Sequence, residues 1–105
     1  METYVKIAGQ EYPAKVRLRS ADPDHGCRKT ATVIMQGSVD EIKALFEDPG
    51  QWQTVQKDDE GNVVKVTDCS EYERLLVVKD HLDGRVSAVL CAFTAEEILQ
   101  VLMGG

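Results

Sequence analysis

The sequence lacks an even set of cysteines. Its three cysteines, Cys27, Cys69 and Cys91, form an odd set without a Cys-x-x-Cys pair. Secreted domains more often carry an even number of cysteines, and a zinc site needs His or Cys ligands at close spacing. The sequence therefore favours neither a disulfide framework nor a zinc site, and we expect three reduced thiols in a protein made in the cytoplasm.

Long apolar runs are missing as well. The first residues contain no apolar stretch as long as a signal peptide, and no segment approaches the length of a membrane-spanning helix. Positive charge is scarce, because 12 Lys and Arg stand against 18 Asp and Glu, for a formal net charge of −6. Since such a surface repels phosphate backbones and anionic lipid head groups, we predict no nucleic-acid partner and no membrane partner.

The length of 105 residues leaves room for one hydrophobic core. Hydrophobic residues make up 43% and charged residues 29%, which is ordinary globular usage and argues against a disordered or fibrous chain. No internal repeat, linker or low-complexity segment divides the sequence. We expect a single domain over residues 1–105, too small for an enzyme with separate cofactor and substrate domains.

Most of the chain has the pattern of β-strands. Alternate residues from Tyr12 to Leu18 share one face, which predicts a single half-buried strand over residues 12–18. Pro13 near its beginning indicates an edge strand or the start of a strand. Further strands are expected at about residues 5–7, 29–36, 52–55, 62–66, 72–79 and 85–93, with turns at residues 9–10, 58–61 and 80–84.

Two segments carry the signals of a helix start. Ser38 and Glu41 form a capping box before an apolar helical face, and Thr94 and Glu97 form another. Asp-Pro-Gly at residues 48–50 ends the first helix. We predict two short helices at about residues 38–47 and 94–103. The fold class is therefore α+β, a β-rich and mostly antiparallel domain of about six or seven strands.

The densest group of metal-binding residue types lies in one loop. Asp22, Asp24, His25 and Cys27 are close in sequence, and a divalent metal accepts such donors. The same loop is rich in turn formers flanked by aspartates, and no second ligand cluster at a fixed spacing accompanies it. We favour a solvated loop and assign no metal ligand, which leaves open whether this loop binds a metal.

His81 lies between Asp80 and Asp83 and is a candidate general base. The dipeptide Asp83-Gly84 is also a strong turn signal between two strands, and the sequence displays no nucleophile or substrate pocket beside it. We therefore favour a hairpin turn. The acidic runs at residues 58–60 and 96–97 are interpreted as a turn and a helix N-terminus. No catalytic and no cofactor-binding residue is assigned.

The surroundings of the three cysteines differ. Cys91 lies in an apolar strand and is expected to be buried, whereas Cys69 lies in a polar break that is compatible with exposure. Cys27 precedes Arg28 and Lys29, and local positive charge lowers the pKa of a thiol. Cys27 is therefore the best candidate for a reactive cysteine.

Two further features have both a functional and a structural interpretation. Gly104 and Gly105 end the sequence as in ubiquitin-like modifiers and sulfur carriers, but a helix directly before them favours a C-cap at Gly104. Phe46, Trp52 and Tyr72 are candidates for an aromatic contact patch. Since single aromatic residues more often fill a core, we expect Phe46 and Trp52 to be largely buried.

Several segments together are similar to a known group of proteins. They are VDEIKALFED at residues 39–48, Trp52, DCSEY at 68–72, VKDHLDGRV at 78–86 and FTAEE at 93–97. Over about residues 39–97 this pattern resembles small prophage-encoded proteins of Gram-positive gut bacteria, which occur among phage tail and baseplate genes. The resemblance implies a structural or accessory role and transfers no catalytic residue.

The sequence thus predicts a non-enzymatic structural or accessory protein of a phage or prophage tail region, without a cofactor. Its expected partners are other protein subunits, a second copy of the chain among them, in a particle assembled after cytoplasmic synthesis. The alternatives are a small protein- or peptide-binding module and a ubiquitin-like or sulfur-carrier protein using Gly104 and Gly105. A polar, concave, unpaired sheet edge would favour the binding module over the assembly subunit.

Overall fold

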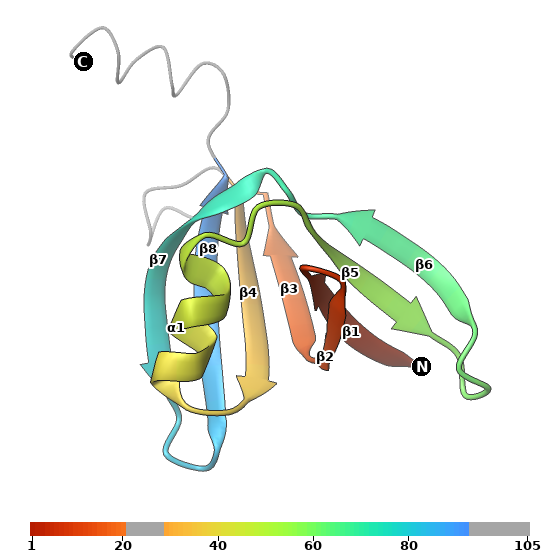
Figure 1. Cartoon of the computed structure of the whole chain (residues 1–105), viewed down its shortest axis with the longest axis horizontal. Coiled ribbons are helices and arrows are strands. Elements are labelled where there is room, and N and C mark those ends of the chain that lie inside the picture. The colour runs from red at the N-terminus through yellow and green to blue at the C-terminus, as the bar shows by residue number, and fades with distance from the viewer. Residues whose placement is uncertain (21–28, 93–105) are drawn as a thin grey trace, which may run out of the picture.

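A computed structural model describes residues 1–20 and 29–92 of the chain. In this part, eight strands form two four-stranded antiparallel sheets, and one helix packs against them (Figure 1). The β-rich α+β fold class is therefore confirmed. The elements are β1 (Glu2–Ile7), β2 (Gln10–Pro13), β3 (Lys15–Arg19), β4 (Lys29–Gln36), α1 (Val39–Glu47), β5 (Trp52–Lys57), β6 (Val63–Asp68), β7 (Tyr72–Asp80) and β8 (Arg85–Ala92).

The chain builds the two sheets in alternation. Sheet I has the strand order β2-β1-β5-β6, and sheet II has the order β3-β4-β8-β7. Each sheet thus joins two antiparallel strand pairs that are far apart in sequence, through β1 with β5 and through β4 with β8. The central strand β8 is buried along nearly its whole length. Edge strands are β2 and β6 in sheet I, and β3 and β7 in sheet II.

The single strand expected over residues 12–18 is wrong. The segment is two strands, β2 and β3, which belong to different sheets and meet at Ala14. The Ala14 amide donates a hydrogen bond to the Thr3 carbonyl (3.0 Å), and the chain then leaves sheet I for sheet II. Alternation of side chains continues across this crossing, so periodicity alone did not reveal the break. Pro13 does lie in an edge strand, as expected, but at the end of that strand and not near its beginning.

The remaining strand predictions within the described residues are confirmed, with ends shifted by a few residues. The turn between β1 and β2 falls at Ala8-Gly9, one residue before its expected place at 9–10, because Ile7 pairs with Gln10. Ala8 and Gly9 both have positive φ, 53° and 80°. Positive φ at both central residues is the geometry of the two-residue turn whose twist matches that of paired strands.

The first helix is confirmed at Val39–Glu47 with Ser38 as its N-cap. The Ser38 hydroxyl accepts a hydrogen bond from the Glu41 amide (3.2 Å), which satisfies one of the unpaired donors of the first turn. Ile42 and Phe46 are four residues apart and form the buried face of the helix. The second helix expected at residues 94–103 lies outside the described residues. In the described part, no helix is long and apolar enough to cross a membrane.

Sheet I and α1 together cover one face of sheet II. The helix lies over β7 and β8, and β1 and β2 lie over the other half of that sheet (Figure 1). Trp52 of β5 is fully buried at the junction, where its ring meets Phe46 of α1 edge to face at 5.4 Å and Tyr72 of β7 at 6.5 Å. Its indole N–H also donates to the Tyr72 carbonyl (3.1 Å). The expected burial of Phe46 and Trp52 is confirmed.

Replacing the indole tests how far this junction stabilises the fold. We expect Trp52→Phe to lower the free energy of unfolding by about 1–3 kcal/mol, since a buried carbonyl loses its donor and the core loses volume. Urea unfolding followed by circular dichroism measures the change. Leu82→Ala is the control, because Leu82 is 90% exposed and its truncation should cost less than about 0.5 kcal/mol. Equal midpoints for Trp52→Phe and wild type would contradict the assignment.

Candidate functional site

A groove in the described surface lies where the chain crosses from sheet I to sheet II. This groove, of about 680 Å³, is lined by both sheets and is open to solvent on one side. Met1 and Tyr4 line it from sheet I, and Pro13 and Ala14 line it from the crossing itself. On the side of sheet II, the lining includes the side chains of Lys15, Ile34, Met35 and Arg85. The break at Ala14 therefore creates the groove.

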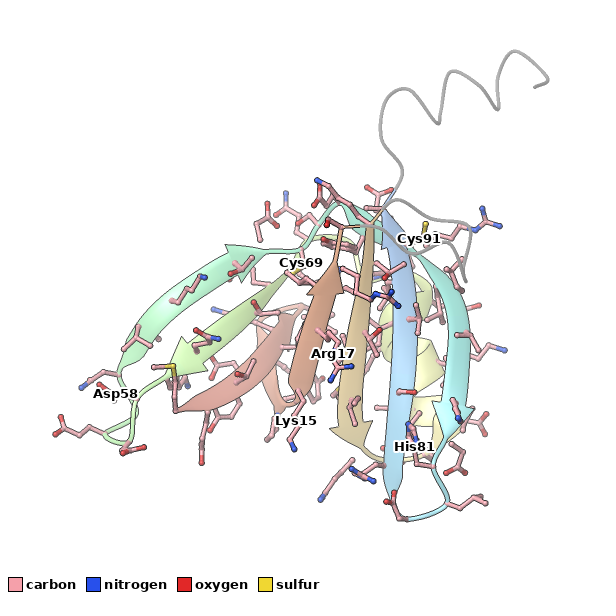
Figure 2. All side chains as sticks on the ribbon, turned by 180° about the vertical axis from the view of Figure 1, so that it is seen from behind. Lys15, Arg17, Asp58, Cys69, His81 and Cys91 are labelled. Atoms are coloured by element: carbon pink, nitrogen blue, oxygen red, sulfur yellow. The ribbon has the colours of Figure 1, made fainter. Side chains whose placement is uncertain are left out.

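Two basic residues lie beside the groove, on the face of sheet II that points away from α1. Lys15 and Arg17 of β3 project from that face in Figure 2, where α1 lies behind the sheet. In the β3–β4 register, Lys15 is opposite Ile34 and Arg17 is opposite Thr32, so the two cations stand two residues apart on one face. Both are exposed, and neither makes an ion pair with any residue in the described part of the chain.

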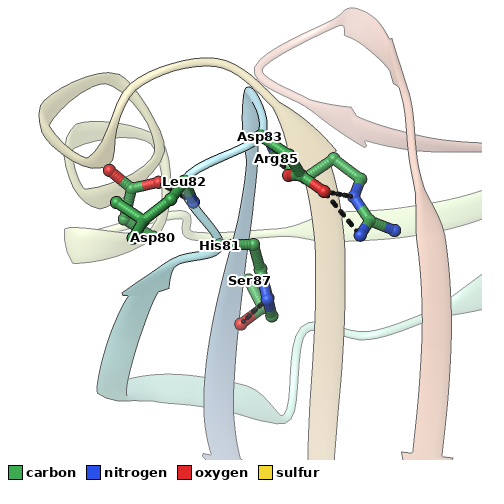
Figure 3. A network of polar contacts seen from close by, with 6 residues as sticks. All are labelled: Asp80, His81, Leu82, Asp83, Arg85 and Ser87. Carbon is green, nitrogen blue, oxygen red and sulfur yellow. Dashed lines mark hydrogen bonds and ion pairs between the residues drawn. The ribbon is translucent and has the colours of Figure 1, made fainter.

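The segment around His81 is the hairpin turn that the sequence favoured. The His81 amide donates to the Arg85 carbonyl (3.0 Å), and the Leu82 amide donates to the Asp80 carboxylate (2.8 Å). The ring Nε2 of His81 lies 3.1 Å from the hydroxyl oxygen of Ser87 on β8 (Figure 3). Ser87 is buried, so this contact gives its hydroxyl a polar partner. The geometry assigns these groups to the turn.

Asp83 holds Arg85 at the end of the same hairpin. Its carboxylate accepts from the Arg85 amide (3.1 Å) and Nε (2.9 Å), and lies 2.7 Å from a terminal nitrogen of the guanidinium (Figure 3). The hydrogen bonds from Arg85, together with its positive charge, lower the pKa of Asp83. The hydrogen bond to Asp83 and the negative charge of that carboxylate raise the pKa of Arg85. The Asp83 carboxylate thus fixes the orientation of the Arg85 side chain, one of the cations that line the groove.

The other candidate residues of the sequence analysis lie outside the described residues. These are Asp22, Asp24, His25 and Cys27 of the candidate metal loop, and Gly104 and Gly105. Over residues 1–20 and 29–92, no three His, Cys, Asp or Glu side chains gather closely enough to hold a metal ion. The acidic residues 58–60 form a turn, in which the Asp58 carboxylate accepts from the Glu60 amide (3.0 Å) and the Asn62 amide (2.9 Å).

The expectation of three reduced thiols is wrong, because Cys91 is disulfide-bonded. Cys91 is buried, as its apolar strand predicted. Cys69 is a free thiol, and it is fully buried although its polar neighbours suggested exposure. Its amide donates to the Trp52 carbonyl (2.9 Å), which draws the residue into the core beside the aromatic junction. Burial raises the pKa of the Cys69 thiol to about 11.

The outer face of sheet I has its own polar cluster. Lys57 binds the Glu11 carboxylate (2.6 Å) and lies 4.8 Å from the centre of the Tyr4 ring. The Tyr4 hydroxyl donates to Glu2 (2.5 Å). In the strand registers, Val55 is opposite Tyr4, and it is almost fully buried. This cluster therefore covers Val55, and its charges compensate one another.

The edge strand β6 exposes apolar side chains. Val63, Val64 and Val66 are 55%, 50% and 52% exposed. The strand pairs with β5 on one side only, as the end of the order in sheet I. Figure 1 shows β5 and β6 extending away from sheet II, so that β6 forms an outer margin of the molecule. Unpaired edges with exposed apolar residues are prone to pair with another strand.

Comparisons of the chain with family models, with curated proteins and with solved structures find no match. The resemblance to prophage proteins therefore stays a prediction.

Two surfaces of interest were not singled out from the sequence. The groove depends on the crossing at Ala14, and Lys15 and Arg85 come together there only because β3 and β8 flank β4. The sequence of β6 did carry a signal of a strand that is prone to pair with another chain, because Val-Val-Lys-Val is a short β-type segment with a single charge. Nothing local indicated that this strand would lie at an edge.

The pair of Asp83 and Arg85 makes a prediction for acid titration. Since the pKa of Asp83 is lowered in the folded state, its stabilising contribution is present at neutral pH and is lost as the pH falls through that lowered value. In Arg85→Gln we expect the pKa of Asp83 to rise toward its ordinary value. NMR titration of the carboxyl carbon measures both midpoints. Identical midpoints in the two proteins would show that Arg85 is not the cause.

Burial of Cys69 makes a second prediction, for its reactivity. We expect alkylation by iodoacetamide to be slow in the folded protein and to keep accelerating up to about pH 11, because only the thiolate reacts. Peptide mapping by mass spectrometry measures labelling at this residue, and the urea-unfolded chain serves as the control. Equally fast labelling of the folded and unfolded chains would contradict the buried position.

Proposed function

We propose that this protein is a non-enzymatic structural or accessory subunit that acts through protein–protein contacts, with the edge of β6 as its contact with a second copy. The resemblance to prophage-encoded proteins supports a place in a phage or prophage tail region, with synthesis in the cytoplasm and incorporation in a phage particle. We propose no nucleic-acid or membrane partner, in keeping with the net charge of −6.

The observation that carries the proposal is a difference between β6 and the other edge strands. The edge β2 has four residues and ends in Pro13, which cannot donate to a further strand. Along β3, Lys15, Arg17 and Arg19 place positive charge on the edge. Two register shifts interrupt β7. These are the features by which proteins protect sheet edges, and β6 has little of them.

The edge of β6 offers a regular template. Its register shift lies near its start, opposite Gln56 and Lys57, and from Lys65 to Asp68 each residue pairs in order with β5. One lysine, Lys65, is the sole basic residue of the strand. The exposed valines would be removed from water on pairing, which adds hydrophobic stabilisation to the backbone hydrogen bonds.

A two-fold axis perpendicular to the sheet pairs β6 with itself and keeps each face continuous. With Val66 opposite its own copy, Lys65 is opposite Thr67 and no like charges meet. A register centred on Lys65 would instead place two lysines directly opposite each other, which is unfavourable. We therefore propose the first register for the dimer.

The apolar character of this edge also helps to decide between an assembly subunit and a peptide-binding module. A polar and concave edge would favour a peptide-binding module, whereas exposed valines favour a contact that stays buried once formed. The edge of β6 therefore supports the assembly subunit.

A single charge on the edge tests the proposal. We expect the wild-type protein to form dimers with rising concentration and Val66→Lys to stay monomeric, because the lysines would meet at the two-fold axis. Sedimentation velocity at several concentrations measures the mass. Val77→Lys is the matched control, since Val77 is 43% exposed on the other sheet and should leave dimerisation unchanged.

Two results of the sedimentation experiment would contradict the proposed dimer. A wild-type monomer throughout the concentration series overturns the proposal, and so does a dimer that Val66→Lys leaves intact. Circular dichroism and urea unfolding show that Val66→Lys is folded, which we expect because its side chain is half exposed.

A further inference from the structure

We propose that the groove between the two sheets, with Lys15 and Arg17 beside it, binds an extended acidic segment of another protein. The segment would place an apolar side chain in the groove and two carboxylates, two residues apart, on the two cations. This inference rests on the proposed function only in taking the partner to be a protein, and it does not use the edge of β6.

The groove provides the apolar part of the site. Pro13, Ala14, Ile34 and Met35 contribute to its lining, and it has about 680 Å³ of space. Ile34 remains partly exposed in the centre of sheet II, on the face that no described helix or strand covers (Figure 2). A concave surface with an apolar lining and a few charged groups is the usual form of a ligand site.

The charged residues in and beside the groove differ in whether they already have a polar partner within the chain. Of the charged residues in the lining, Glu2 accepts from the Tyr4 hydroxyl and Arg85 is held by Asp83. Lys15 has no such partner in the described part of the chain, and neither does Arg17 next to it on the same face. In a protein of net charge −6, two adjacent uncompensated cations form a local positive surface that attracts carboxylates.

The spacing of the two cations specifies the shape of the ligand. Lys15 and Arg17 are alternate residues of one strand, so their Cα atoms are about 6.7 Å apart. An extended peptide repeats its side chains on one face at the same distance. Carboxylates at alternate positions of an extended segment therefore match the cations, whereas adjacent carboxylates would point to opposite sides.

A short acidic peptide suits the site better than a nucleic acid does. A phosphate backbone carries charge along its whole length and would meet the acidic remainder of the surface, including the carboxylate of Glu2 in the groove. An acidic segment that also has apolar residues brings its negative charge only to the two cations. The side chain that it places in the groove is uncharged.

Fluorescence anisotropy with labelled peptides tests the proposal. The probe is Leu-Thr-Glu-Thr-Glu-Thr-Leu, whose arrangement is the same for both chain directions. We expect saturable binding that weakens with salt. We also expect weaker binding of Leu-Thr-Glu-Glu-Thr-Thr-Leu and none of the peptide with lysine in place of glutamate. A single-stranded oligothymidine of ten nucleotides serves as the polyanion.

A matched pair of variants locates the binding. Lys15→Glu with Arg17→Glu should weaken binding of the probe by about tenfold or more, because attraction becomes repulsion. Lys6→Glu with Lys43→Glu changes the net charge by the same amount at exposed positions of sheet I and α1 and should leave binding within about twofold of wild type. Circular dichroism shows that both variants are folded.

Three results would overturn the inference. They are no saturable binding of the acidic probe, equal weakening by the two double variants, and binding of oligothymidine as tight as that of the peptide. Because the groove lies within one chain, binding should persist in Val66→Lys. Failure of the β6 dimer and failure of the groove are therefore distinguishable.

Discussion

The aromatic junction at Trp52 is the interaction on which the arrangement of the two sheets depends. Trp52 belongs to sheet I, yet its ring contacts Phe46 of the helix and its N–H donates to the backbone of Tyr72 in sheet II. One side chain thus joins sheet I, the helix and sheet II. The buried donor makes the position specific, because an apolar ring of similar size would leave the Tyr72 carbonyl without its partner. Cys69 is buried as a consequence, since its amide binds the Trp52 carbonyl.

The two sheets meet through β1 and β2, while β5 and β6 extend beyond sheet II, and both proposed contacts depend on this arrangement. The chain must cross between the sheets at Ala14, and the space beside the crossing is the groove. The strands β5 and β6 extend beyond sheet II, so nothing in the described chain covers the valines of β6 (Figure 1). A dimer through β6 would leave the groove of each copy available. Such a subunit would bind its own kind by one surface and a different protein by another.

Sequence patterns predicted the elements far better than they predicted the site. Six of the eight described strands and the helix follow from alternation, turn residues and the capping serine, which are local signals. The hairpin at His81 was predicted correctly for the same reason. The split of residues 12–18 was missed because both halves keep one alternation through Ala14, and the burial of Cys69 was missed because its neighbours in sequence are polar. Lys15 and Arg85 were not connected, since their proximity depends on the strand order of sheet II.

The sequence alone determined the secondary structure, the β-rich class and the acidic character, because propensity, capping and net charge are properties of neighbouring residues or of the whole composition. Tertiary structure decided which strands became edges and which basic side chains came to share a face. A valine in a central strand and a valine in an edge strand have the same local pattern, and only the pairing of β1 with β5 left β6 at the margin. The exposure of these groups is a property of long-range pairing, and that exposure is what makes them available to a partner.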